Sequence, residues 1–136
     1  MTGGIIEMSR RKKLIPVVEV IAFIATTGSV WEIEKREKAQ EKYLREYAKA
    51  HNIHIVGSVH RNGLGQNEAN RQFDKIIKLI SQKHVEGIIV ANMMAISKSI
   101  PDAYYKIGKV KEAGGVIISV DEGVLEMKVK TTEELL

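Results

Sequence analysis

The chain contains no cysteine, and only two of its 136 residues are proline. Without cysteine the chain has no disulfide, no zinc–thiolate site and no thiol nucleophile, and it suits a reducing compartment. It also lacks low-complexity runs, and its apolar fraction of 44% is ordinary for a globular protein. These properties argue against a long disordered region. The length suits one domain.

Long apolar runs are also missing. The longest, Val20 to Ala25 and Ile88 to Ala91, fall far short of the roughly 20 residues that a membrane-spanning helix needs. The N-terminal region lacks the uninterrupted apolar stretch of a signal peptide, because Glu19 interrupts it. We therefore expect a cytoplasmic protein with no membrane partner.

The charge is moderately positive, with a net value of +4 and a pI near 9.3. Such a balance permits nucleic-acid binding without requiring it. The densest basic cluster is Arg10, Arg11, Lys12 and Lys13, within residues 1–15, which we expect to form a flexible basic leader. The cluster is equally consistent with a solubilising tail and with an arm that contacts DNA phosphates, and these four residues are the candidate DNA-binding residues.

Apolar runs alternate with amphipathic segments along the chain, with amphipathic helices expected at 32–51, 68–83 and 101–113. Strands are expected at 17–26, 53–59, 86–92 and 116–120, with a short edge strand near 125–129. This order predicts one α/β domain over 16–130, with a central, mainly parallel sheet of four to five strands and helices on both faces. Residues 131–136 are expected to start a helix or to form a truncated tail.

Four short sequence blocks, taken in chain order, together resemble the pattern of a known protein family. The strongest is Ala39 to Ala48, which fits the pattern A-Q-x-x-x-L-x-x-Y-A and follows Phe-Ile-Ala-Thr-Thr at 23–27. The others are Asn-Gly-Leu-Gly at 62–65 with Arg-Gln-Phe at 71–73, and Met-Met-Ala-Ile-Ser-Lys at 93–98. Together, over roughly residues 18–122, they resemble the catalytic domain of the serine recombinases, the resolvase and invertase family.

This resemblance implies a resolvase-like fold and a role in site-specific DNA recombination by mobile elements, without a metal or other cofactor. In the family, a serine at the end of the first strand attacks a DNA phosphate, and arginines clamp the phosphate oxygens. The positional matches to that site are Thr27, Ser97, Lys98 and, after a one-residue slip, Arg71. The resemblance further implies DNA as a partner, and either a homo-oligomer or pairing with another recombinase-like chain.

The family's catalytic residues are nevertheless replaced. Ala25 occupies the place of the strand arginine, Thr27 that of the serine, and Met94 and Ala95 those of an aspartate and an arginine. The loss of one oriented contact in an electrostatic site costs about 2.7–4 kcal/mol of transition-state stabilisation. We therefore expect a catalytically inactive domain that acts through DNA-associated or protein–protein binding.

Two alternatives stay open. The first is an active but atypical serine recombinase that uses Thr27 or Ser29, although Ser29 is also typical of a helix cap. The second is an α/β domain that binds a small anionic ligand at the carboxyl ends of its strands, where such sheets place their sites.

Overall fold

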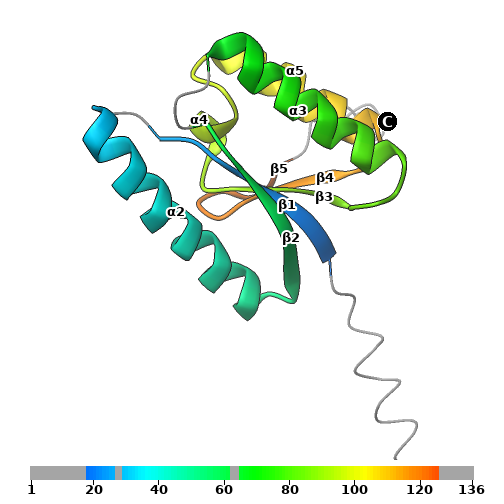
Figure 1. Cartoon of the computed structure of the whole chain (residues 1–136). Helices are drawn as coiled ribbons and strands as arrows, with labels where there is room; N and C mark the ends of the chain where they lie inside the picture. The colour runs from blue at the N-terminus through cyan, green and yellow to red at the C-terminus, as the bar shows by residue number, and fades with distance from the viewer. Residues whose placement is uncertain (1–17, 27–28, 62–64, 126–136) are drawn as a thin grey trace, which may run out of the picture.

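The computed structural model describes residues 18–26, 29–61 and 65–125. The expected basic leader at 1–15, the candidate Thr27 and the expected tail at 131–136 lie outside the described residues. The elements, in chain order, are β1 (Val18–Ile24), α2 (Val30–Ala50), β2 (Ile53–His60), α3 (Gln66–Ser81), β3 (Gly87–Val90), α4 (Met93–Ile96), α5 (Ile100–Glu112), β4 (Val116–Ser119) and β5 (Gly123–Leu125) (Figure 1).

The strands form one five-stranded sheet in the order β2-β1-β3-β4-β5. β1 pairs in parallel with β2 and with β3, and β3 pairs in parallel with β4. The last strand, β5, pairs antiparallel with β4. Parallel neighbours need crossover connections, which α2, α3 and α5 supply. The predicted α/β fold with a mainly parallel sheet is confirmed.

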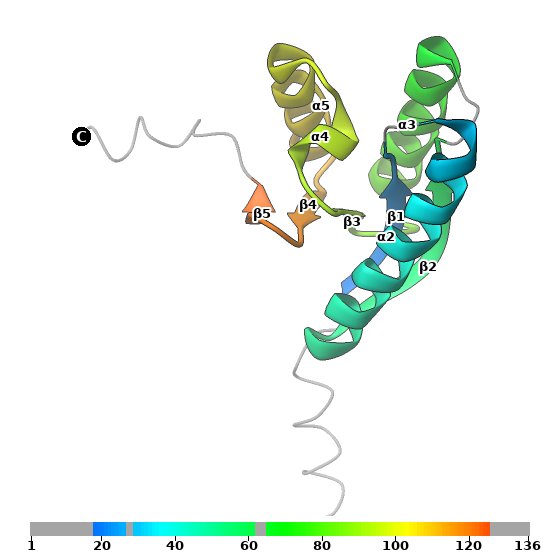
Figure 2. The same cartoon turned by 90° about the vertical axis from the view of Figure 1, so that its left-hand side faces the viewer.

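Helices cover both faces of this sheet, and β1 shows why. Its side chains alternate, so Val20 and Ile24 pack with Leu44 of α2 on one face. On the other face Phe23 meets Phe73 of α3 edge to face, with ring centroids 5.7 Å apart. Figure 1 shows α2 on one side of the sheet and α3 and α5 on the other, and Figure 2 views the molecule from the α2 side.

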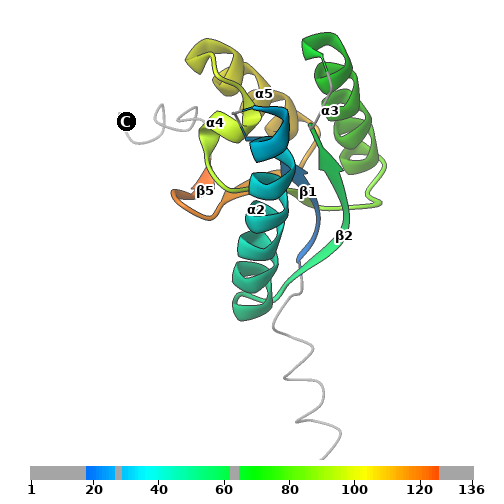
Figure 3. The same ribbon diagram turned by 60° about the vertical axis from the view of Figure 1, so that its left-hand side comes forward.

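The carboxyl ends of the parallel strands meet at one edge of the sheet. In Figure 3 the tip of β2, the short helix α4 and the beginnings of α3 and α5 lie at the same upper end of the molecule. The β1 and β2 ends are tied together, because the Arg61 amide donates to the carbonyl oxygen of Ile24 at 2.9 Å. This edge therefore gathers the segments in which functional side chains were expected.

Helix α2 matches its predicted segment and is capped as its sequence indicates. The Ser29 hydroxyl accepts a hydrogen bond from the Glu32 amide at 3.4 Å, so the helix-cap interpretation of Ser29 is confirmed. After the helix, Asn52 adopts a φ of 57°, which turns the chain into β2. None of the helices in the described ranges combines the length and apolar character that a membrane span requires.

Two elements differ from the sequence-based expectations. Helix α4 was not predicted, because one turn is too short to show a hydrophobic period; Asn92 caps it by accepting a hydrogen bond from the Ala95 amide at 3.2 Å. Strand β5 begins at Gly123, whose φ of 89° permits the tight turn after β4. It therefore starts two residues earlier than the edge strand expected near 125–129.

Candidate functional site

The end of β1 is held by a side chain of the strongest resemblance block. Gln40 accepts a hydrogen bond from the Ala25 amide through Oε1 at 3.0 Å, and its Nε2 donates to the Ala25 carbonyl oxygen at 3.3 Å. The Gln40 side chain therefore satisfies both the backbone N–H and the backbone C=O of Ala25. Gln40 fixes the backbone just before the position of the candidate Thr27.

The side chains at this strand end are small and uncharged. Ala25 is half-buried and packs against the core cluster that contains Phe73. The Thr26 hydroxyl oxygen is buried, and it has no hydrogen-bond partner among the described residues. Position 25 therefore offers no cation to a phosphate.

A polar hollow of about 310 Å³ lies where α3 and α5 begin. Both helix N-termini carry partial positive charge, which favours anions. The N-cap of α3, Gly65, makes no side-chain capping bond, whereas the Ser99 hydroxyl caps α5 by accepting from the Asp102 amide at 3.4 Å. The residues that line the hollow are Gln66, Asn70, Ser97, Lys98, Ser99 and Asp102.

The candidates Ser97 and Lys98 thus lie together in one hollow. The Ser97 hydroxyl oxygen accepts a hydrogen bond from the Ser99 amide at 3.2 Å. Asp102 forms an ion pair with Lys106 at 2.9 Å. The hydrogen bond from Lys106 is the main cause that holds the pKa of Asp102 below its usual range, against the opposing effect of partial burial, and a hydrogen bond with Ser97 lowers it further.

The structure does not bring Arg71 to this hollow. Arg71 is exposed, and its guanidinium pairs with Glu68 of the preceding turn at 3.0 Å. The residue of α3 that lines the hollow is Asn70, one position earlier. Because a one-residue step rotates a helical side chain by about 100°, these two neighbours face different directions.

The positions after β3 are equally free of charge. Ala95 is 2% exposed and belongs to the core, while the Met94 side chain is 66% exposed on the surface. Lysine 98, four residues after Met94, is therefore the cation that this segment supplies. A lysine keeps the positive charge but lacks the planar fork with which arginine clamps two oxygens.

A second polar cluster, which the sequence analysis missed, joins α2 to the end of β2. His60 Nδ1 lies 3.2 Å from Oε1 of Glu37, and His60 Nε2 lies 2.9 Å from Oε1 of Glu41. Glu37 is only 2% exposed, and its Oε2 has no partner among the described residues. Glu37 lies on the same face of α2 as the buried Leu44 and Ala48. A charged residue on the apolar face of a predicted helix is visible in the sequence, and it could have indicated this cluster.

A neutral imidazole donates from one nitrogen only, so His60 serves both carboxylates when its ring carries two protons. For Glu41, the hydrogen bond from Arg45 is the main cause of a lowered pKa; partial burial opposes it, and the contacts with His60 add to it. In the described ranges no group of three or more histidine, aspartate or glutamate side chains is arranged to hold a metal ion.

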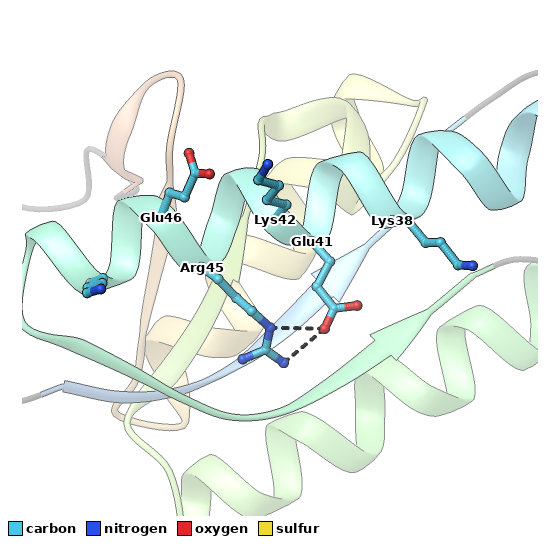
Figure 4. Close-up of a pocket in the computed structure, with 6 residues that line it drawn as sticks. Lys38, Glu41, Lys42, Arg45 and Glu46 are labelled. Carbon is cyan, nitrogen blue, oxygen red and sulfur yellow. Dashed lines mark hydrogen bonds and ion pairs between the residues drawn. The ribbon is translucent and has the colours of Figure 1, made fainter.

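A shallow hollow of about 410 Å³ runs along the outer face of α2 (Figure 4). Arg45 and Glu41 point toward each other there and form two hydrogen bonds, at 3.0 and 2.9 Å. All six lining residues come from the same helix, and four are cations and two are anions: Lys38, Glu41, Lys42, Arg45, Glu46 and Lys49. This arrangement is typical of a solvated helix face with ion pairs one turn apart.

Comparison with known proteins supports the resemblance seen in the sequence. The family profile described as "Resolvase, N terminal domain" matches residues 29–136. A resolvase family site-specific recombinase from Streptococcus pneumoniae has a similar structure, with a TM-score of 0.69 and 18% identity, over 87% of this chain and 82% of the other. The C-terminal catalytic domain of ISC1926 TnpA, an IS607-like serine recombinase, gives 0.60 and 15%, over 87% and 78%. At these identities the structures show a shared fold. No curated protein matches this sequence.

Proposed function

Because this chain belongs to the resolvase family of serine recombinases, we propose that it is a resolvase-like domain that binds DNA without cutting it. The observation that carries the proposal is the apolar character of two positions where the family's chemistry calls for arginine. Ala25 and Ala95 are both packed against the core, so neither can clamp a phosphate. At about 2.7–4 kcal/mol for each missing contact, the two losses together correspond to a rate reduced by roughly four to six orders of magnitude.

The cations that remain at the carboxyl edge support binding rather than catalysis. Lys98 lines the hollow between α3 and α5, and Arg61 directly follows β2 beside the end of β1. Because these two cations lie apart, each can neutralise a phosphate of the DNA backbone, but they do not surround a single phosphate as catalysis would require. The basic leader, with Arg10 to Lys13, adds up to four further phosphate contacts in this proposal.

DNA affinity measured over a range of salt concentrations tests the binding. Each phosphate neutralised on a duplex contributes about 0.9 to the slope of log affinity against log salt. Replacing all four basic residues at 10–13 by alanine should therefore flatten that slope by roughly 3–4 units. An unchanged slope would make the leader a solubilising tail. If the intact chain binds no DNA even at low salt, the DNA part of the proposal fails.

Pairing with a second copy of the chain is the other part of the proposal. Ile100, Tyr104 and Tyr105 are 67%, 49% and 62% exposed on the first turns of α5, although large apolar side chains are usually covered. Ala103 and Ile107 of the same helix are buried in the core instead. Sedimentation of the wild type and of Tyr104→Ser/Tyr105→Ser should show a concentration-dependent dimer that the double variant loses. A wild type that stays monomeric at all concentrations would contradict this part.

A further inference from the structure

Helix α5 buries a charged side chain on its apolar face. Lys106 is 6% exposed, and Ala103, Ile107 and Val110 make up the rest of the buried face. Its Nζ lies 5.6 Å from the centroid of the Phe73 ring. Taking an ammonium group out of water is costly unless the group is paired and hydrogen-bonded, and an apolar residue would fill the same space at no such cost.

The partners of Lys106 come from two helices. Its Nζ donates to Oδ1 of Asn70 in α3 at 2.8 Å and pairs with Oδ2 of Asp102 in α5 at 2.9 Å. Both partners line the hollow that also contains Ser97 and Lys98, whereas Lys106 itself is not one of the lining residues. The buried lysine therefore stands behind the wall of the hollow and holds two side chains of that wall.

The contact with Asn70 sets the direction of its amide. Oδ1 accepts a second hydrogen bond, from Nε2 of Gln66 at 2.9 Å, so two donors hold the oxygen end. The Nδ2 end makes no hydrogen bond within the described part of the chain and keeps two N–H donors for a ligand. If the Asn70 amide were flipped, its Oδ1 would face the hollow, and this acceptor would repel an anion.

The contact with Asp102 offsets a charge. A lone carboxylate in the hollow would oppose any phosphate near Lys98. With Lys106 at 2.9 Å, the negative charge of Asp102 is balanced within the protein. One buried cation thus holds the oxygen end of the Asn70 amide and neutralises the Asp102 carboxylate in the same wall.

We propose that Lys106 is a positioning residue, which prepares this hollow to hold a DNA phosphate beside Lys98 without touching the phosphate itself. The inference rests on the proposed DNA binding and names one of its contact points. It assigns to α5 a role that the resemblance blocks did not indicate.

The test compares Lys106→Met, which keeps the length of the side chain, with Lys98→Ala, which removes an exposed cation. Duplex DNA affinity of the full chain is measured over a series of salt concentrations. Lys106→Met should bind about tenfold more weakly at every salt concentration with an unchanged salt slope, because it loses oriented donors but no phosphate-neutralising cation. Lys98→Ala should lower the slope by about 0.9. Wild-type affinity in Lys106→Met, or a slope reduced as in Lys98→Ala, would overturn the inference.

Nuclear magnetic resonance without DNA separates positioning from mere stability. In the wild type, the Nδ2 protons of Asn70 should show cross-relaxation with Ser97 or Lys98. The carboxyl of Asp102 should titrate at a higher pH in Lys106→Met than in the wild type or in Lys106→Arg. Absence of cross-relaxation from the Nδ2 protons of Asn70 to both Ser97 and Lys98 would refute the inference even if Lys106→Met does not fold. If the spectra agree but the wild type binds no DNA, the proposed function fails and the orienting role of Lys106 stands.

Discussion

Replacing Gln40 by alanine removes both hydrogen bonds to the backbone of Ala25, at 3.0 and 3.3 Å. A typical hydrogen bond contributes about 0.5–1.5 kcal/mol, and a buried group left without a partner costs about 1–3 kcal/mol. Ala25 is half-buried, so water replaces part of what is lost, and we expect a decrease in the free energy of unfolding of about 2 kcal/mol. For a domain of this size, that corresponds to a melting temperature lower by about 5–10 °C.

Urea unfolding followed by circular dichroism measures this change, and amide exchange at Ala25 locates it. Alanine has the higher intrinsic helix propensity, so the helix itself should gain slightly from the substitution. The matched control is Lys42→Ala on the exposed face of α2, which should change stability by less than about 0.5 kcal/mol. Equal effects of the two substitutions, or unchanged exchange at Ala25, would refute the role assigned to Gln40.

Two other perturbations test contacts elsewhere in the domain. In Gly87→Ala the new Cβ would collide with the carbonyl oxygen of Val116 on the neighbouring strand, so calorimetry should show a loss of several kcal/mol or no folded protein; near-native stability would contradict the close approach of β3 and β4. The pKa of Asp102 is lowered from its ordinary value of 3.8 in the folded state, so this carboxylate adds stability above that pH, which is lost as the pH falls through the folded-state pKa. Urea unfolding between pH 6 and pH 2 should therefore show a smaller acid-dependent loss in Lys106→Met than in the wild type, and equal losses would contradict it.

Periodicity predicted the framework of the fold because the core follows it. The nearly continuous apolar run of β1 and the apolar positions Phe73, Ile76 and Ile80 of α3 are visible in the sequence, and these residues face the core. The short helix α4 was not predicted, because contacts from distant parts of the chain hold it in place. Helix α4 is held by the Asn92 cap and by the Glu122 carboxylate, which accepts a hydrogen bond from the Met93 amide at 3.1 Å. That carboxylate lies 29 positions away along the chain, so no local pattern reports it.

The candidate site was predicted less completely than the fold. The sequence placed Ser97 and Lys98 near a strand end, and the structure brings them into one hollow. The sequence did not show that Asn70, and not Arg71, lines this hollow, because that depends on the rotation of α3 about its axis relative to α5. The buried Lys106 could have been noticed as a charge within an apolar helical stripe, but its partners come from the packing of two helices.

Covalent trapping on DNA shows whether this chain can cleave a DNA strand. The full chain is incubated with DNA substrates that would retain a phosphoseryl or phosphothreonyl link, next to a variant with arginine at 25 and 95, aspartate at 94 and serine at 27. We expect no adduct with the wild type, because Ala25 and Ala95 leave the reacting phosphate without its arginine clamps, and we expect any regained cleavage to require the restored residues. A wild-type adduct that disappears in Thr27→Ala would contradict this expectation.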